Sequence, residues 1–528
     1  MTGRRVATLL LACALSAAVP AAAAAEEGRG ARSADLAERF DFSFLGADPD
    51  DQMGVQVRLG DLNGDGLDEL VLGAWLGDGP RNNRINCGEI YVFYGRPVGD
   101  LPGESFDVSV LYGANPGDRI GSCVDTGDFN GDALPDLAVG ARYSGGHPDS
   151  LRPRCGEAFL LLGGSSGSRM EHVDARRDPD LVIYGREPGD RLGRRILIHD
   201  MDGDGKKDLL LAAVGSSGRR GDETDAGAVY FVYGDRREDL DGIIDLAIDE
   251  VPVLHGEDQS DGLGGAMAVG DWNGDGAPDL VLGCGFADGP ANSRTNAGET
   301  FVLFGRPGVR FRGEKVVEEG KNLTIYGGDA YDATGVSVAM GDMDGDGVDD
   351  LAIGANLADG PENERDNCGG VYVLFGHRAP PDSPSIDLAE GADVTVHGEA
   401  PGDQAGSLID LFDWSGDGFG DLIVVSMLHD GPAAGRLDAG MVYAILGGRQ
   451  SNLRPRYDFA ADEADLRLLG PTVNDRIASA LGRSRLGGRP LLILSTMRGD
   501  GPMDERRDAG EVFFLPWDPP RRTTPLDP

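Results

Sequence analysis

Residues 335–355 read GVSVAMGDMDGDGVDDLAIGA and contain the pattern that decides the fold. Two short apolar runs, 335–340 and 351–355, flank the acidic loop Asp342 to Asp350. The loop pattern, D-x-[DNS]-x-D-[GA]-x-x-[DE], recurs about every 71 residues between similar apolar runs. A fixed period of this size predicts a repeat architecture and argues against a set of unrelated domains. The six copies begin at Asp61, Asp128, Asp200, Asp271, Asp342 and Asp413.

Each repeat predicts four short strands, A to D, because alternating apolar runs are bounded by Gly, Pro and Asp. In the fifth repeat these strands are 335–340, 351–355, 371–376 and 393–398. A seventh unit keeps its B and C strands, 491–494 and 512–515, but the segment from Gly482 to Pro490 contains no acid. The seven units begin near Gly46, Gly113, Gly185, Gly256, Gly327, Gly398 and Gly470.

Seven units of four strands predict an all-β fold, a seven-bladed β-propeller over residues 40–517. A solenoid is the structural alternative. Closure is favoured because Phe40 to Leu45 aligns with a D strand that has no repeat before it, whereas the chain ends after a C strand. The N-terminal strand can therefore complete the last blade and remove its exposed edge.

The acidic loops fit calcium, which prefers six to eight oxygen ligands that a short loop supplies at positions 1, 3, 5, 7 (a carbonyl) and 9. We expect up to six calcium ions, one in each of repeats 1 to 6. Position 6 is Gly in five copies and Ala133 in the second, where strain is expected. The predicted ligands are Asp61, Asn63, Asp65, Leu67, Glu69; Asp128, Asn130, Asp132, Leu134, Asp136; Asp200, Asp202, Asp204, Lys206, Asp208; Asp271, Asn273, Asp275, Ala277, Asp279; Asp342, Asp344, Asp346, Val348, Asp350; and Asp413, Ser415, Asp417, Phe419, Asp421.

The alternative for any single copy is a solvated, Asx-rich turn without metal. Six copies in register between A and B strands favour calcium, and the neutral Ser415 oxygen predicts a weaker sixth site. The loop is too short for an EF-hand, because no acid follows at position 12 between helices.

The run G-x-x-[VM]-x-x-G-D-x-[ND]-G-D-G-x-x-D-L-x-x-G-A, followed by D-G-P and G-x-x-[YF]-V-x-[YF]-G, resembles the FG-GAP repeat of integrin α-subunit propellers and their bacterial relatives. The resemblance covers about residues 40–517 and implies a calcium-binding, ligand-binding or adhesive propeller. Segments matching the integrin leg domains, transmembrane helix and cytoplasmic tail do not appear, so integrin signalling is not implied.

The N-terminus predicts export through a signal peptide at residues 1–25. Arg4 and Arg5 precede a mostly apolar stretch, and Ala21 to Ala25 offers a cleavage site. The alternative is a lipoprotein anchored at Cys13, within Leu10-Leu11-Ala12-Cys13. No second apolar run approaches the 18 residues of a membrane span. We therefore expect a secreted or periplasmic protein, with a disordered tail at 518–528.

The 528 residues carry 90 acids against 48 bases, a formal net charge of −42. This charge argues against nucleic acid as a partner, since like charges repel. Five cysteines follow the predicted signal peptide. Cys87, Cys155 and Cys368 occupy equivalent positions in different repeats and should lie too far apart to pair, whereas a Cys123–Cys155 pair within repeat 2 is the alternative. We interpret them as small buried residues: Cys87, Cys123, Cys155, Cys284 and Cys368.

Loops A–B and C–D should open on one face of the propeller, and loops B–C and D–A on the other. An Arg lies four residues before the Gly that opens most C strands: Arg84, Arg152, Arg294, Arg365, Arg436 and Arg506. These arginines could form a cationic ring for an anionic ligand. The favoured interpretation is that each one pairs with a neighbouring acid and holds its loop, because acids are in excess.

No nucleophile, zinc or dinucleotide motif with its required context is present, so we expect no enzymatic activity. Repeat 2 departs most from the others, since its B–C loop, Tyr143 to Arg154, has lost Asp-Gly-Pro and gained His147. The prediction is a monomeric, exported, non-catalytic module that binds an unidentified extracellular protein or glycan. The alternative is a calcium-dependent polysaccharide-active enzyme or a lectin on the same scaffold.

Overall fold

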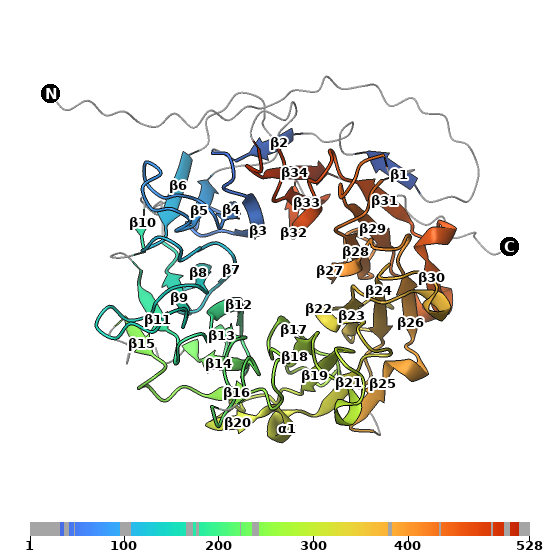
Figure 1. Ribbon diagram of the computed structural model, residues 1–528, viewed down its shortest axis with the longest axis horizontal. Coiled ribbons are helices and arrows are strands. Elements are labelled where there is room, and N and C mark those ends of the chain that lie inside the picture. Colours follow the sequence, from blue (N-terminus) through green and yellow to red (C-terminus); the bar gives the residue numbers. More distant parts are fainter. Residues whose placement is uncertain are drawn as a thin grey trace.

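Seven sheets lie around a central axis in the computed structural model (Figure 1). The structure describes residues 32–35, 42–46, 48–94, 107–164, 173–175, 179–221, 223–234, 242–378, 383–431, 435–486, 489–500 and 507–516. The predicted signal peptide, Cys13, Phe40 and the C-terminal tail lie outside these residues. The predicted seven-bladed β-propeller is confirmed.

Four strands make the inner part of every blade, ordered A, B, C and D from the axis outward. In blades 1 to 3 they are β3 (Met53–Gly60), β4 (Glu69–Ala74), β5 (Glu89–Tyr94), β6 (Asp107–Tyr112); β7 (Val124–Gly127), β8 (Asp136–Ala141), β9 (Glu157–Leu161), β11 (Leu181–Tyr184); and β12 (Leu192–His199), β13 (Asp208–Ala213), β14 (Ala228–Val232), β16 (Val253–His255).

Blades 4 to 7 repeat this order, and the last blade takes its D strand from the start of the chain. Their strands are β17 (Ala266–Gly270), β18 (Asp279–Cys284), β19 (Glu299–Leu303), β21 (Leu323–Tyr326); β22 (Thr334–Gly341), β23 (Asp350–Ala355), β24 (Gly370–Leu374), β26 (Val394–His397); β27 (Ala405–Phe412), β28 (Asp421–Ser426), β29 (Met441–Ile445), β31 (Leu466–Leu469); and β32 (Ile477–Leu486), β33 (Arg489–Thr496), β34 (Glu511–Pro516), β2 (Phe42–Leu45).

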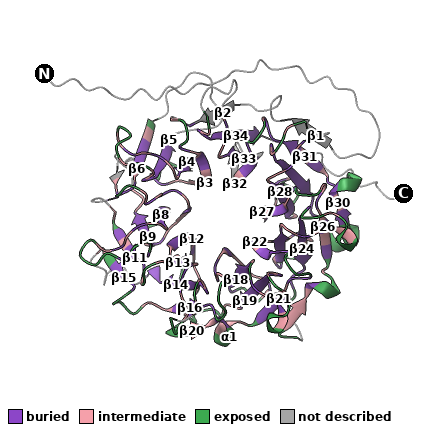
Figure 2. Ribbon diagram, viewed as in Figure 1, coloured by how far each residue is buried: buried purple, intermediate pink, exposed green. Residues whose placement is uncertain are grey.

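The B strands are buried on both faces, because each blade lies between two others. All six residues of β23 are buried, whereas buried and half-buried residues are mixed along β22 near the axis. Figure 2 shows the buried residues along the blades and most exposed ones in loops and at the outer rim. The apolar core is therefore a series of inter-blade clusters, such as the one joining Val371 and Val373 of blade 5 to Ile409 and Val424 of blade 6.

A glycine bulge turns the chain into several A strands. In blade 5 the register between β22 and β23 shifts between Thr334 and Ser337, and Gly335 lies there with φ +92°. A Cβ atom on Gly335 would lie 2.8 Å from Thr300 Oγ1 and 2.9 Å from Glu299 O of blade 4. Glycine is required because the backbone both adopts a left-handed conformation and approaches the neighbouring blade closely.

The N-terminal strand closes the ring, as predicted. β2 pairs antiparallel with β34, with Phe42 opposite Phe514 and Leu45 opposite Glu511. One apolar cluster then joins the first and last blades, since Val57 and Leu72 contact the group that contains Ile493 and Phe514. The last blade is a four-stranded sheet whose outer strand comes from the opposite end of the chain.

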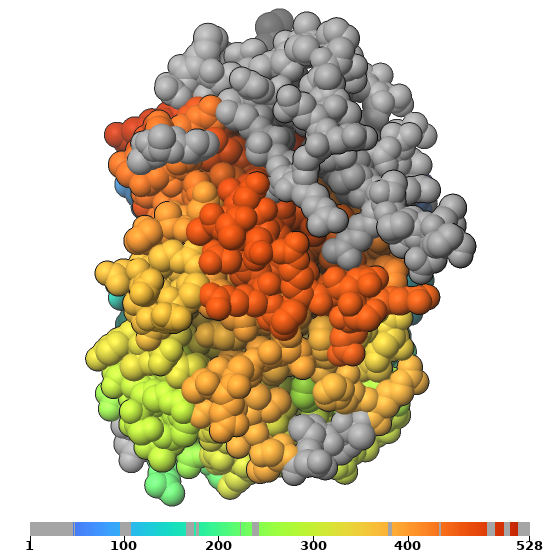
Figure 3. Space-filling view, turned by 90° about the vertical axis from the view of Figure 1, so that its right-hand side faces the viewer, coloured from blue at the N-terminus to red at the C-terminus, as the bar shows by residue number. Residues whose placement is uncertain are grey.

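The prediction of only four strands per blade was wrong for blades 1 to 6. Each of these has a fifth, outermost strand that runs parallel to its D strand. In blades 1 to 5 it comes from the C–D segment of the next repeat, and in blade 6 it comes from the N-terminal segment that precedes β2. The Figure 3 side view shows part of this outer rim. The fifth strands are β10 (Val173–Asp174), β15 (Ile243–Asp245), β20 (Glu314–Val316), β25 (Ser385–Asp387), β30 (Arg456–Asp458) and β1 (Arg32–Asp35), in blades 1 to 6.

Helical turns are short and lie outside the sheets. They are α1 (Val317–Gly320), η2 (Pro290–Asn292), η3 (Pro361–Asn363), η4 (Leu388–Glu390), η6 (Gln450–Asn452) and η7 (Phe459–Ala461). No described helix has the length and apolar character needed to cross a bilayer. The five described cysteines are free and buried, as expected, and Cys123 and Cys155 of repeat 2 do not pair.

Candidate functional site

The six acidic loops connect the A and B strands, and their side chains are ordered by their own backbone. In the fifth loop, Asp342 accepts hydrogen bonds from the N–H groups of Asp346 (3.1 Å) and Gly347 (2.9 Å). Asp344 also accepts from Asp346 N–H (3.1 Å), and Asp346 accepts from Val348 N–H (2.8 Å). Such Asx turns fold the loop so that carboxylates at positions 1, 3 and 5 lie on one side.

The acid at position 9 is the first residue of the B strand, and its carboxylate accepts hydrogen bonds from backbone N–H groups. Asp350 accepts hydrogen bonds from the N–H of Met343 (2.7 Å) through one oxygen and from that of Gly376 (2.9 Å) through the other. Burial raises its pKa to about 7, since desolvation disfavours the charged form. The pKa is raised in the same way to about 7 for Glu69, Asp208 and Asp279, and to about 6 for Asp136 and Asp421.

The donor sets fit a hard divalent cation. Carboxylate oxygens of Asp342, Asp344 and Asp350 lie within 4.8 Å of one another, as do those of Asp200, Asp202 and Asp208. In the first loop, Glu69 Oε2 is buried and has no hydrogen-bond partner among the described residues. A cation at these loops would satisfy that oxygen and offset the burial of several carboxylates. Calcium itself remains a prediction for all six loops.

Backbone hydrogen bonds connect neighbouring acidic loops around the ring. The N–H at position 8 donates to the position 1 carbonyl of the preceding loop, from Lys207 to Asp128 (3.1 Å), Asp349 to Asp271 (3.1 Å) and Gly420 to Asp342 (2.6 Å). Position 8 is Pro135 in the second loop and Pro278 in the fourth, which cannot donate. At these three junctions, the backbone of one acidic loop therefore helps to fix the backbone of the next.

Two loops differ from the others in their residues or contacts. Ala133 has φ 71°, so the strain expected from alanine at position 6 of the second loop is present. In the third loop, Arg310 forms ion pairs with Asp202 and with Asp204, the latter at 2.9 Å. Sequence reasoning missed this arginine, which comes from the C–D segment of repeat 4 and neutralises two of the predicted ligands.

On the opposite face, arginines of the B–C loops pair with acids of the fifth strands. Arg365 donates to Asp458 Oδ1 (2.8 Å) and Oδ2 (2.7 Å), and its guanidinium also donates to Gly398 O. The predicted pairing of these arginines is confirmed for the described pairs, and the acid belongs to the next repeat. The pairs are Arg84–Asp174, Arg152–Asp245, Arg294–Asp387 and Arg365–Asp458.

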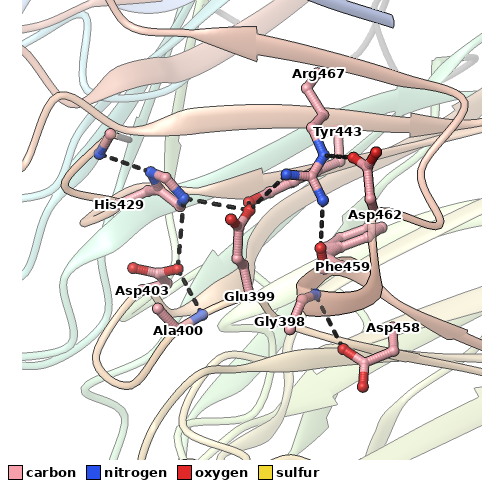
Figure 4. A network of polar contacts seen from close by, with 12 residues as sticks. Gly398, Glu399, Ala400, Asp403, His429, Tyr443, Asp458, Phe459, Asp462 and Arg467 are labelled. Atoms are coloured by element: carbon pink, nitrogen blue, oxygen red, sulfur yellow. Dashed lines mark hydrogen bonds and ion pairs between the residues drawn. The ribbon is translucent and has the colours of Figure 1, made fainter. Parts of the chain in front are cut away.

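Blade 6 contains a buried polar network that the sequence did not indicate (Figure 4). Glu399 accepts from Tyr443 Oη (2.7 Å) and Arg467 (3.0 Å), and it lies 3.4 Å from His429 Nε2. Burial would raise the pKa of Glu399, but hydrogen bonds from His429 and Tyr443 and the charge of Arg467 lower it to about 2. His429 Nδ1 accepts from Gly431 N–H (2.9 Å).

The role of His429 becomes clear from the other blades. In blades 1 and 2 the glutamate that opens the C strand accepts from the B–C loop, Glu89 from Gly79 N–H (2.9 Å) and Glu157 from Gly146 N–H (3.0 Å). Blade 6 has Met441 at that position, so His429 provides the acceptor instead. We therefore interpret the network as a structural one that fixes the conformation of the B–C loop.

A cavity of about 780 Å³ follows the propeller axis and is lined by A strands of all seven blades. Its lining includes four arginines and two aspartates, although the whole chain is strongly acidic. Arg58 pairs with Asp125 at 3.0 Å between blades 1 and 2. At the B–C end, Trp75 and Arg142 follow the B strands of those blades. This axial cavity is a candidate site for ligand binding.

Comparisons with known proteins agree with the repeat pattern. A family model described as "FG-GAP repeat" matches residues 334–374, which include β22, the fifth acidic loop, β23 and β24. Phosphatidylinositol-glycan-specific phospholipase D of Mus musculus is 33% identical over 244 residues, covering 46% of this chain and 26% of that protein. Integrin alpha-PS5 of Drosophila melanogaster is 33% identical over 179 residues, covering 33% of this chain and 16% of that protein.

Integrin alpha-5 of Xenopus laevis is 30% identical over 182 residues, covering 33% of this chain and 16% of that protein. The chain thus spans about a quarter of the length of the phospholipase D relatives and about a sixth of the integrin chains. The names of these relatives describe different activities.

Proposed function

We propose that this chain, an FG-GAP-repeat β-propeller, is an exported calcium-binding scaffold that recognises an extracellular protein or glycan without catalysing a reaction. The observation that supports it best is the division between the two faces. Six acidic loops of one design lie on one face, whereas the B–C and D–A loops on the other face differ in length and chemistry. Recognition commonly resides on variable loops held by a rigid scaffold.

Calcium would act as a structural cross-link in this proposal. In the fifth loop it would be held by Asp342, Asp344, Asp346, the Val348 carbonyl and Asp350, which bring charge from both ends of the loop to one point. A metal that binds only the folded state adds about 2.7 kcal/mol of stability per site at a hundredfold excess over its dissociation constant. Several occupied loops would therefore raise the melting temperature substantially.

The calcium part is tested by melting the purified protein in calcium and in EGTA, and by counting bound metal after gel filtration. We expect a large rise in melting temperature with calcium and several ions per chain. Asp344→Ala should lower the metal count, whereas Arg485→Ala, in the acid-free segment of blade 7, should leave it unchanged. Equal melting temperatures in the two buffers, or a metal count near zero, would refute calcium binding.

The recognition part is tested by exchanging the B–C loop 142–154 for that of another repeat. Binding to a partner captured from the native medium should change, while the calcium-linked rise in melting temperature stays the same. A partner whose binding is abolished by Asp344→Ala in saturating calcium, but not by the loop exchange, would place recognition on the other face.

An enzyme remains the second candidate, because several relatives are named phosphatidylinositol-glycan-specific phospholipase D. Their match covers about a quarter of their length, so the shared region alone does not carry over that activity. The alternative is a calcium-dependent enzyme acting on a glycan or glycolipid. Release of product from a phosphatidylinositol-glycan or a polysaccharide by the purified chain, abolished by one loop substitution, would favour it.

A further inference from the structure

Two arginines and two aromatic residues form a compact cluster at the B–C end of the axial cavity. The Arg142 guanidinium carbon lies 5.3 Å from the ring centre of Trp75 and 4.9 Å from that of Tyr143. The Arg119 guanidinium carbon lies 5.2 Å and 5.1 Å from the same two rings. Blade 1 supplies the tryptophan, and repeat 2 supplies the other three residues. Contact with aromatic faces holds both guanidinium groups in place while leaving their N–H donors available.

Arg476 occupies the position equivalent to Arg119 in another repeat and pairs with an aspartate that Arg119 lacks. Arg119 and Arg476 each follow a buried aspartate of a D–A turn, and their N–H groups donate to the carbonyls of Asn86 (3.2 Å) and Asp438 (3.1 Å). The Arg476 side chain forms an ion pair with Asp438 at 3.1 Å. Arg119 faces a neutral asparagine at the matching position, so its charge is left uncompensated there.

Two arginines that line the axial cavity near this cluster also lack acidic partners in the described part of the chain. Among the described residues, Arg142 and Arg194 have no ion-pair partner, and Arg142 Nε is buried without a hydrogen-bond acceptor. Burial lowers the pKa of both, and repulsion adds to this effect, from Arg119 on Arg142 and from Arg142 on Arg194. A half-buried charge without a partner is costly unless another group satisfies it. The cluster is therefore incomplete in the protein alone.

A recess continues outward from the cluster. It has a volume of about 420 Å³ and is lined by Asn86, Gly117, Arg119, Tyr143 and Arg154. Arg119 and Tyr143 thus separate this recess from the axial cavity, and Arg154 adds a further exposed cation. Volumes of this size are typical of sites for small molecules.

We propose that Arg119, Arg142 and Arg194, with Trp75 and Tyr143, form a binding site for a small organic anion that carries a carboxylate or a phosphate monoester. Arginine donors match the paired oxygens of both groups. The overall charge of −42 repels polyanions, so the site suits a ligand with one or two charges. This site lies on the face proposed for recognition, but it requires neither calcium nor the proposed scaffold function.

Titration calorimetry with glucuronate, glucose 6-phosphate, inorganic phosphate and neutral glucose tests the proposal. We expect at least one organic anion to bind, more weakly as salt increases, and glucose not to bind. Arg142→Gln and Arg119→Gln should each weaken binding at least about tenfold, as for loss of a charge-assisted contact. Arg476→Gln and Arg507→Gln, which remove paired arginines elsewhere, should bind as the unmodified protein does.

Asn86→Asp supplies a second test that keeps every arginine. It restores the acid that Arg476 has in Asp438, so it should weaken anion binding without lowering the melting temperature. Equal binding of glucose, binding of inorganic phosphate alone, no binding of any anion, or unchanged affinity in Arg142→Gln and Asn86→Asp would overturn the proposal. Anion binding that persists while the calcium-linked melting shift is absent would instead refute only the proposed calcium scaffold.

Discussion

At the residue scale, positions 5 and 9 of the acidic loops have different roles. Asp350 satisfies buried N–H groups of its own loop and of Gly376, whereas Asp346 is exposed and satisfies one N–H within the loop. Asp350→Ala should therefore reduce the free energy of unfolding in EGTA by about 2 kcal/mol, since it leaves buried donors unpaired. Asp346→Ala should reduce stability mainly in calcium. Urea unfolding in both buffers checks this, and equal losses in EGTA would contradict it.

Glu399 gives the protein an acid-sensitive contribution to stability. Its pKa falls from its usual 4.5 to about 2 in the folded state, so its contribution is complete above pH 4.5 and is lost as the pH falls toward 2. After allowance for its partial exposure, this contribution is about 2 kcal/mol. Glu399→Gln should thus destabilise the protein at pH 7, and the difference from the unmodified protein should narrow below pH 4.5.

The control for this measurement is Glu364→Gln, which changes an exposed glutamate of the blade 5 B–C loop. Its stability should follow that of the unmodified protein at every pH. A difference between Glu399→Gln and the unmodified protein that stays constant from pH 7 to pH 3 would show that the carboxylate charge is not what stabilises the network.

At the scale of elements, an arginine–aspartate ion pair joins the fifth strand to the B–C loop in blades 1, 2, 4 and 5. Arg365 and Asp458 are mostly buried and make two hydrogen bonds, so a double-mutant cycle should give a coupling energy of about 1–3 kcal/mol. The exposed pair Arg507–Asp50 should give a much smaller coupling energy, because solvent screens it. Similar coupling energies for the two pairs would mean that the fifth strands are held by backbone pairing alone.

The sequence predicted the A, B and C strands because each has a long apolar run bounded by turn residues. It missed the fifth strands because most have two to four residues, too few to show a period of two. Their trace in the sequence is an Asp between apolar residues, as in Ile244-Asp245-Leu246 and Ile386-Asp387-Leu388. The partner of that Asp lies about 90 residues away, a separation that local patterns do not reveal.

The candidate sites differed in how far they could be predicted. The acidic loops are contiguous and repeated, so their residues and their common face followed from the sequence. Trp75, Arg119, Arg142 and Arg194 come from three consecutive repeats and meet because their blades lie side by side around the axis. Asn86 occupies the position that Asp438 has beside Arg476. This difference between repeats could be recognised only after the blades were superposed, because the structure is needed to show which residues correspond.

At the scale of the whole molecule, two N-terminal strands hold the ring together at different blades. β2 completes blade 7, and β1 covers the outer edge of blade 6 by pairing with β31. Deleting residues 26–35 should lower the melting temperature modestly, because blade 6 still has four strands. Deleting residues 26–45 should also expose the edge of β34 and cause aggregation. Light scattering during thermal melting checks this, and two deletions with the same behaviour would contradict it.

Because β2 and β34 pair as neighbouring strands, the ring could also be opened at another junction between blades. In repeat 5, residues 375–384 lead from β24 to β25, which is the fifth strand of blade 4, and a linker of that length should likewise join β34 to β1. The chain could then be cut between blades 4 and 5, for instance after Gly328. Such a circular permutant should fold and keep the calcium-linked melting shift, as circular dichroism would show. Failure to fold would mean that the order of synthesis, and not only the final contacts, guides ring closure.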